Sequence, residues 1–131
     1  MNDDVAALIR YRLDQARTAL DDATFLLEGD RSPQSIINRA YYAMFYAALA
    51  LLQKIGKAPS KHSGVISLFD TEFVAKGIFT RDLSRDLHRA FEQRQASDYR
   101  TTEIPAKEKA KETLEKATLF VEAVKGHLSG P

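Results

Sequence analysis

Residues 38–52 read NRAYYAMFYAALALL, and the apolar and aromatic side chains of this stretch do not keep to one helical face. Ala40 and Met44 mark one side of a helix, whereas Tyr42, Phe45 and Tyr46 spread around it. A helix that is apolar nearly all round has to be buried on more than one side. The stretch therefore predicts either a central core helix or a core helix that also forms a homodimer contact. Any buried tyrosine hydroxyl in it needs a hydrogen-bond partner.

The segments on either side of this stretch carry helical signals of their own. From Val5 to Leu27 the apolar residues recur at steps of three and four, which predicts a helix that ends at Gly29. Ser32 followed by Pro33 predicts the start of the central helix, because the serine can accept an orphan amide hydrogen bond and proline has no amide hydrogen to lose. We expect that helix to end near residue 55.

Three further helices are expected in the rest of the chain. A short helix follows APSKHSG and ends before Gly77, the next begins near Thr80, and the last begins near Pro105 and fades into a loose tail over residues 126–131. No segment shows the sustained period of two that marks a strand, and the connections are short. The sequence therefore predicts an all-α fold, an up-and-down bundle of four to five helices forming a single domain over residues 1–131.

Composition excludes several classes of function. The 131 residues include 19 Lys plus Arg and 18 Asp plus Glu, so a net charge of +1 provides no general attraction for nucleic acid or an anionic membrane. The absence of cysteine excludes disulfide scaffolds, thiolate zinc sites and thiol nucleophiles. The acidic start MNDDVAALIR does not resemble a secretory signal, and the most apolar stretch is shorter than the 20 or so residues that span a bilayer. We expect a soluble, cytoplasmic protein with no membrane contact.

Motifs for metal and cofactor chemistry are missing. A carboxylate-bridged di-metal site in a helical bundle needs Glu-x-x-His pairs, but the residues three before the histidines are Pro59, Arg85 and Val124. There is no glycine-rich phosphate loop, no dinucleotide fingerprint and no Gly-x-Ser-x-Gly elbow. We therefore expect no metal and no cofactor.

Three polar features remain. The arginines at 81, 85 and 89 share one helical stripe, but Asp82 lies three residues before Arg85, which favours a solvated face with surface ion pairs over a phosphate-binding stripe. His62 in KHSG is either a structural hydrogen-bonding residue or a functional one. The segment FEQRQASDYR places Arg94 four residues before Asp98, close enough for an ion pair, and is by itself compatible with a charged helix end.

Three segments in this order and separation, INRAYYAMFYAALALL, KHSGVISLF and FEQRQASDY, resemble the HEPN domains of small prokaryotic proteins encoded beside a minimal nucleotidyltransferase. The resemblance covers nearly the whole chain. It implies a bundle of four to five helices that forms homodimers and often acts as the toxin of a toxin–antitoxin pair. In the active branch of the family an arginine, four to six residues and a histidine form a metal-independent ribonuclease site at the dimer cleft, and Arg94 matches that arginine.

The chain departs from this motif, because the positions equivalent to the histidine are Tyr99, Arg100 and Thr101. A tyrosine with a pKa near 10 is a poor base at neutral pH. Some family members carry a tyrosine beside the motif that receives a nucleotide from the partner nucleotidyltransferase, and Tyr99 is the candidate for that acceptor. His62 is the alternative source of an imidazole.

The resemblance thus implies a homodimeric HEPN subunit, paired with a minimal nucleotidyltransferase antitoxin, that binds nucleotide or RNA without the standard Arg/His site. The expected binding residues are Asn38, Arg39, Tyr42, His62, Arg94 and Asp98. The alternative is a toxin endoribonuclease, with Arg94 and Tyr99 as the catalytic candidates and a non-standard base. A third reading is a helical dimerisation protein whose polar cluster is only structural.

Overall fold

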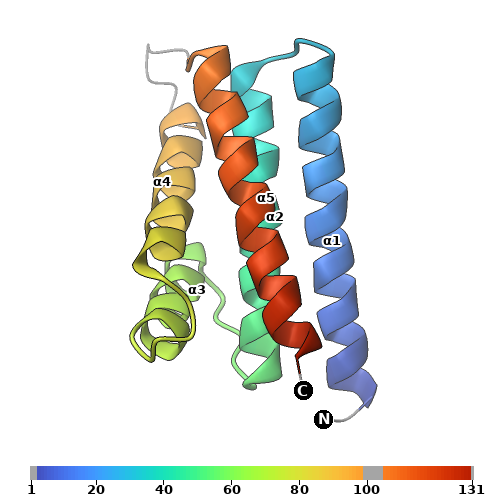
Figure 1. Cartoon of the computed structure of the whole chain (residues 1–131), viewed down its shortest axis with the longest axis vertical. Coiled ribbons are helices and arrows are strands. Elements are labelled where there is room, and N and C mark those ends of the chain that lie inside the picture. Colours follow the sequence, from blue (N-terminus) through green and yellow to red (C-terminus); the bar gives the residue numbers. More distant parts are fainter. Residues whose placement is uncertain (1–2, 99–104, 131) are drawn as a thin grey trace.

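The computed structural model describes residues 3–98 and 105–130, and all regular structure in these two ranges is helical. The elements in chain order are α1 (Asp3–Glu28), α2 (Pro33–Lys54), α3 (His62–Phe69), η1 (Asp70–Val74), α4 (Arg81–Asp98) and α5 (Lys107–Ser129). The four long helices run alternately up and down, and α3 with η1 forms a short arm between α2 and α4 (Figure 1). The all-α, up-and-down prediction is confirmed.

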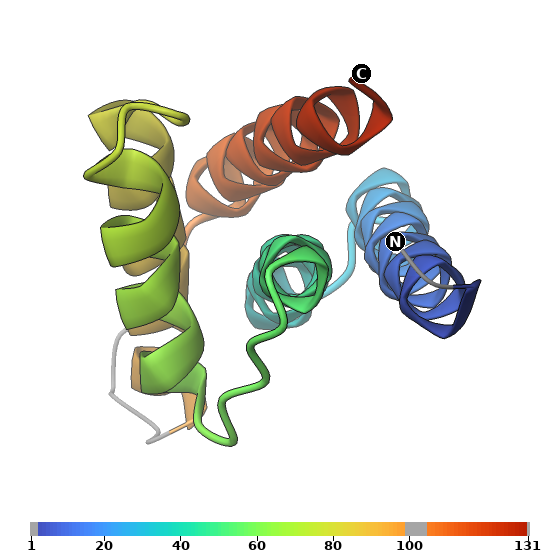
Figure 2. The same cartoon turned by 90° about the horizontal axis from the view of Figure 1, so that it is seen from below.

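Helix α2 lies at the centre of the bundle. Seen along the bundle, α1, α5 and the pair α3 and α4 surround it on three sides (Figure 2). Its 12 buried residues are Ile36, Ile37, Ala40, Tyr41, Ala43, Met44, Phe45, Ala47, Ala48, Ala50, Leu51 and Leu52. The residues between them that stay partly exposed recur at steps of three and four and so form one stripe. They are Asn38, Arg39, Tyr42, Tyr46, Leu49 and Gln53. The expectation that residues 38–52 form a helix in the core, common to both readings, is therefore confirmed, and the stripe is the remaining side of the helix.

The helix starts predicted from the sequence have the expected capping groups. The Ser32 hydroxyl accepts a hydrogen bond from the Ser35 amide at 3.4 Å, and Pro33 is the first residue of α2. The Thr80 hydroxyl accepts from the Leu83 amide at 3.3 Å and caps α4. After α2, Gly56 has a φ of 76°, a backbone conformation that glycine adopts without steric cost.

The third predicted helix differs from the expectation in two respects, its start, which lies inside the APSKHSG segment and not after it, and its second half. It begins at His62, and its second half is the π-turn η1, closed by a hydrogen bond from the Ala75 amide to the Asp70 carbonyl at 2.8 Å. The Asp70 carboxylate accepts a hydrogen bond from the Ser84 hydroxyl at 2.6 Å and contacts His88 Nε2 at 2.7 Å. These two contacts join η1 to α4. π-Turns are rare and have no distinct sequence signature, so the apolar spacing alone predicted an ordinary helix.

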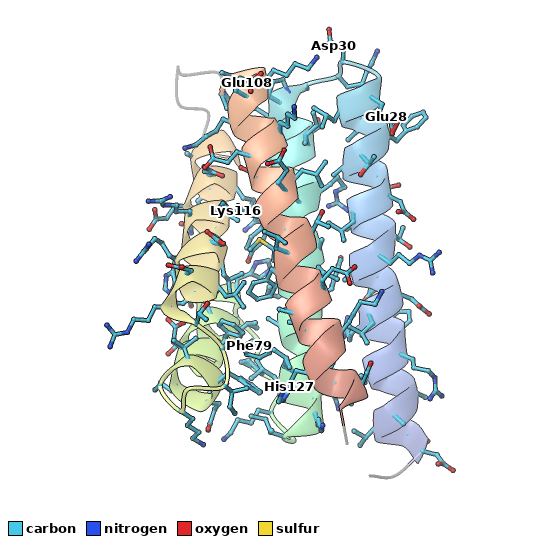
Figure 3. All side chains as sticks on the ribbon, in the orientation of Figure 1. Glu28, Asp30, Phe79, Glu108, Lys116 and His127 are labelled. Atoms are coloured by element: carbon cyan, nitrogen blue, oxygen red, sulfur yellow. The ribbon has the colours of Figure 1, made fainter. Side chains whose placement is uncertain are left out.

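Helix α5 is longer than the sequence indicated. Residues 126–129, expected as a loose tail, continue the helix to Ser129. The imidazole of His127 meets the ring of Phe79 edge-on at a centroid distance of 5.3 Å, and both labelled side chains lie toward the lower end of the bundle (Figure 3). This aromatic contact holds the last turn of α5. The start of α1 and the end of α5 lie at the same end of the bundle (Figure 1).

None of the helices in the described ranges has the length and apolar character needed to cross a membrane.

Candidate functional site

Arg94, in the last part of α4, is seated on the aromatic side chains of α2. Its Nη2 donates a hydrogen bond to the Tyr42 hydroxyl at 3.2 Å. The guanidinium carbon lies 5.7 Å from the centroid of the Tyr41 ring and 5.5 Å from that of the Tyr42 ring, within the range of cation–π attraction. The two consecutive tyrosines therefore hold the guanidinium of Arg94, which lies 52 residues after Tyr42 in the chain.

His62, the first residue of α3, belongs to the same cluster. Its Nδ1 lies 2.9 Å from the Tyr41 hydroxyl. Its ring stacks on Phe45 with a centroid distance of 4.1 Å and an interplanar angle of 20°, and it meets the edge of the Tyr42 ring at 5.8 Å. Helices α2, α3 and α4 thus bring one imidazole and one guanidinium to the same pair of tyrosines.

A second guanidinium borders the cluster from α2 itself. Arg39 Nε and Nη2 donate to Asn38 Oδ1 at 3.1 and 2.9 Å, a fork that fixes the plane of the guanidinium. The Arg39 guanidinium carbon lies 5.0 Å from the centroid of the Tyr42 ring. The Tyr42 ring therefore has an arginine from each of two helices, α2 and α4, in contact with it.

The cluster shifts the pKa values of two of its members. Burial raises the pKa of the Tyr41 hydroxyl, and the nearby Arg94 charge only partly offsets this, so the phenol keeps its proton at any physiological pH. Burial lowers the pKa of His62, and the positive charge of Arg94 lowers it further. At neutral pH the imidazole is therefore mostly uncharged.

The described surface includes three hollows whose lining bears on the site. The hollow between α4 and α5, which Arg89, Gln93 and Lys116 help to line, holds about 20 Å³, room for a water molecule but not for a nucleotide. A groove of about 440 Å³ between α1 and α5 is mostly apolar. A third, of about 290 Å³ between α1 and α2, is lined partly by Tyr46 and Arg39 and so adjoins the tyrosine cluster. Of the three, only this groove continues the candidate site.

Most of the predicted binding residues lie together. Asn38, Arg39, Tyr42, His62 and Arg94 form one connected set through the contacts above. Asp98 is the last residue of α4, and its side chain lies outside the described residues, as does the whole of Tyr99. The predicted ion pair between Arg94 and Asp98 and the roles suggested for Tyr99 remain predictions.

The sequence prediction missed two members of the site. Tyr41 is fully buried and links His62 to Arg94, and Phe45 carries the stacked imidazole. The signal for Tyr41 was present, since a tyrosine on the buried stripe of a core helix needs a polar partner for its hydroxyl. The identity of that partner, 21 residues away, depends on how the segment between α2 and α3 folds back.

The arginine stripe of α4 has the predicted character of a solvated face. Arg85 Nη1 lies 3.3 Å from Asp82 Oδ1, and both side chains are mostly exposed. Such exposed pairs contribute little to stability. Arg94 differs from these arginines in being half-buried against aromatic rings.

Comparison with known proteins gives one family over most of the chain. The model of the HEPN domain matches residues 9–127. A Thermotoga maritima protein named "UPF0332 protein" is 40% identical over 117 residues, which cover 89% of this chain and 88% of the relative. Two Methanocaldococcus jannaschii proteins are named "Putative toxin": one is 33% identical over 95% of this chain and 92% of its own length, the other 36% identical over 70% and 63%.

Proposed function

This chain belongs to the HEPN domain family, and from that premise we propose that it is the HEPN subunit of a nucleotidyltransferase-associated toxin–antitoxin-like system. In this proposal the subunit binds nucleotide or RNA in a cleft of a homodimer, without the standard Arg/His ribonuclease site. The observation that carries the proposal is the position of Arg94, whose guanidinium is held by the hydroxyl of Tyr42 and the rings of Tyr41 and Tyr42 beside His62.

The ligand class follows from the side chains of this cluster. Guanidinium groups are planar, permanently charged donors that match the oxygens of a phosphate, and the cluster contains two of them, Arg39 and Arg94. Aromatic rings that are partly exposed offer stacking surfaces for unpaired bases. Tyr42 and Tyr46 are partly exposed and in ring contact at 5.8 Å. A single-stranded RNA or a nucleotide supplies both a phosphate and a base.

The proposed homodimer rests on the exposed stripe of α2. Tyr42, Tyr46 and Leu49 are large side chains that the described part of the chain leaves partly uncovered along a helix otherwise buried. A second subunit packed along this stripe would bury them and bring two copies of the Arg94 cluster near each other. Aromatic residues are enriched at such interfaces.

The proposed partner is a minimal nucleotidyltransferase acting as antitoxin. Support comes from the family resemblance and from the relatives that are named as toxins, since a toxin requires a neutralising partner. In this scheme Tyr99, five residues after Arg94, is the acceptor of a nucleotide from the partner. Mass spectrometry of the protein produced with and without a neighbouring nucleotidyltransferase tests the assignment, and an unmodified Tyr99 in both samples would contradict it.

The second candidate function is a toxin endoribonuclease that uses Arg94 with a non-standard base. The observation that favours it is the imidazole of His62 in the same cluster as Arg94, which places a titratable group near a phosphate-binding one.

One experiment separates these functions. The purified protein is incubated with a fluorescein-labelled single-stranded RNA, and both binding and cleavage are measured for the wild type, for Arg94→Ala and for Arg85→Ala as the matched control on an exposed face of the same helix. Binding without cleavage that Arg94→Ala loses and Arg85→Ala keeps supports the binding proposal. Cleavage that depends on Arg94 would replace it with the ribonuclease. A lower melting temperature with unchanged binding in Arg94→Ala would leave only a structural role.

A further inference from the structure

Among the described residues, the hydroxyl of Tyr41 has one partner to which it can donate its hydrogen. Tyr41 is 0% exposed, so water cannot serve as acceptor. Across the described residues, the one hydrogen bond of this hydroxyl is to His62 Nδ1, at 2.9 Å. Leaving a buried donor unsatisfied is costly, so the phenolic hydrogen points at Nδ1.

This direction fixes the tautomer of His62. A neutral imidazole carries its single hydrogen on one nitrogen, and the nitrogen that accepts a hydrogen bond is the one without it. Nδ1 accepts from Tyr41, so the hydrogen lies on Nε2. Turning the ring by 180° would put Cδ2, which cannot accept a hydrogen bond, against the hydroxyl, and the ring is also stacked on Phe45 at 4.1 Å and on Tyr41 at 5.8 Å, so Nδ1 stays in place.

The neutral histidine therefore presents a donor, not a lone pair, at Nε2. Within the described chain Nε2 has no hydrogen-bond partner, since the single bond of this side chain is made by Nδ1. The imidazole and the Arg94 guanidinium lie near the same two rings. The centroid of the imidazole is 5.8 Å from the ring centroids of both Tyr41 and Tyr42. The guanidinium carbon of Arg94 is 5.7 Å from the Tyr41 centroid and 5.5 Å from the Tyr42 centroid.

We propose that Tyr41 is a positioning residue that holds His62 as an Nε2–H donor, so that His62 and Arg94 together form a site for the anionic oxygens of a phosphate or phosphodiester. This inference rests on the proposed binding function and gives it a physical form. In this proposal two donors beside the same pair of tyrosine rings bind one anion, but no lone pair is available to take the proton of a ribose 2′-hydroxyl. The site binds a phosphodiester and does not cut it.

The tautomer is measured directly by nitrogen NMR. In protein labelled with ¹⁵N-histidine at pH 7.5, two-bond correlations identify which nitrogen of each ring carries the hydrogen. We expect His62 with an unprotonated Nδ1 and a protonated Nε2. In Tyr41→Phe, which removes the hydroxyl from an otherwise retained ring, we expect the His62 signals to move toward a mixture of both tautomers. A protonated Nδ1 in the wild type, or unchanged signals in Tyr41→Phe, would overturn the inference.

Binding of inorganic phosphate tests the donor role. We expect His62→Ala to weaken binding roughly tenfold, the effect of losing one hydrogen bond to a charged group. We expect His62→Gln to stay close to the wild type, because its amide can place an N–H near the position of Nε2. Phosphate binding unaffected by His62→Ala, or lost equally in His62→Gln, would contradict the donor role. The proposed function is judged separately by RNA binding to Arg94→Ala, so a failure of the donor role can be told apart from a failure of the proposed function.

Discussion

Arg94 and Tyr42 should be energetically coupled, and a double-mutant cycle measures the coupling. Tyr42→Phe removes the hydroxyl that accepts from Arg94 Nη2 at 3.2 Å and keeps the ring under the guanidinium. A net hydrogen bond is worth about 1 kcal/mol, and the charge of the donor raises this while partial exposure lowers it. We therefore expect Tyr42→Phe to lower the free energy of unfolding by about 1 kcal/mol.

Arg94→Ala should cost more, because it removes the ring contacts as well as the hydrogen bond. Each cation–π contact at a partly exposed site contributes about 0.5–1 kcal/mol, so the described contacts predict a loss of about 2 kcal/mol in total. In the Arg94→Ala background the Tyr42 hydroxyl has already lost this partner, so adding Tyr42→Phe removes no further hydrogen bond. The cycle should then give a coupling free energy of about 1 kcal/mol.

Urea unfolding followed by far-ultraviolet circular dichroism measures all four proteins, and thermal melting provides a second reading. For a chain of this length, about 1 kcal/mol corresponds to a shift of roughly 4 °C in Tm. The same cycle with Arg85 in place of Arg94 is the control and should show no coupling, because Arg85 pairs with Asp82 on an exposed surface. A coupling between Arg94 and Tyr42 within error of that control would mean that the guanidinium is not seated on α2, and the site as described would be wrong.

Three further predictions concern stability. The lowered pKa of His62 means that the unfolded chain binds a proton more readily than the folded one, so the contribution of His62 to stability is full above pH 6.5 and falls as the pH drops below it. The free energy of unfolding, measured in urea from pH 7.5 to pH 5, should decline less in His62→Gln than in the wild type. An equal decline in both would refute the assignment. Phe69→Ala, at a fully buried ring, should lower the free energy of unfolding by about 3–5 kcal/mol, whereas Phe25→Ala, at a side chain that is 76% exposed, should change it little. Similar losses in both variants would contradict the burial of Phe69 in the core. Asp70→Asn should lower the free energy of unfolding by about 1 kcal/mol, because it weakens the two contacts that join η1 to α4. The control is Asp82→Asn, since the side chain of Asp82 is 82% exposed. A loss no larger than in this control would argue that Asp70 does not join η1 to α4.

The helices could be predicted from the sequence because their signals are local. Ser32, Pro33 and Thr80 mark helix starts by their own chemistry, and the apolar spacing within each segment sets its buried face. The π-turn and the last turn of α5 depend on distant contacts instead. The ring of Phe79, 48 positions before His127 in the numbering, packs against that imidazole, and no local pattern contains this information.

The site could be predicted only in part, for the same reason. The resemblance predicts Arg94 and Tyr42 as site residues, and the sequence leaves His62 as either a structural or a functional histidine. What the sequence could not provide is the geometry that gives each residue its role: Tyr41 between an imidazole and a guanidinium, and Phe45 beneath the imidazole. These contacts join α2 to α3 and α4 across separations of 17 to 53 residues, so they exist only once the bundle has formed.

The shared location of the start of α1 and the end of α5 decides how another polypeptide can be tethered to this protein. Arg94 lies toward the opposite end of α4, and α5 alone, with 23 residues, is about 35 Å long. A fused chain that has to reach the guanidinium from either end therefore needs a linker of at least about ten extended residues, and more if the linker is flexible. An affinity tag or a short-linker fluorophore attached at either end would leave the arginine accessible, which makes surface-immobilised binding measurements suitable for this molecule.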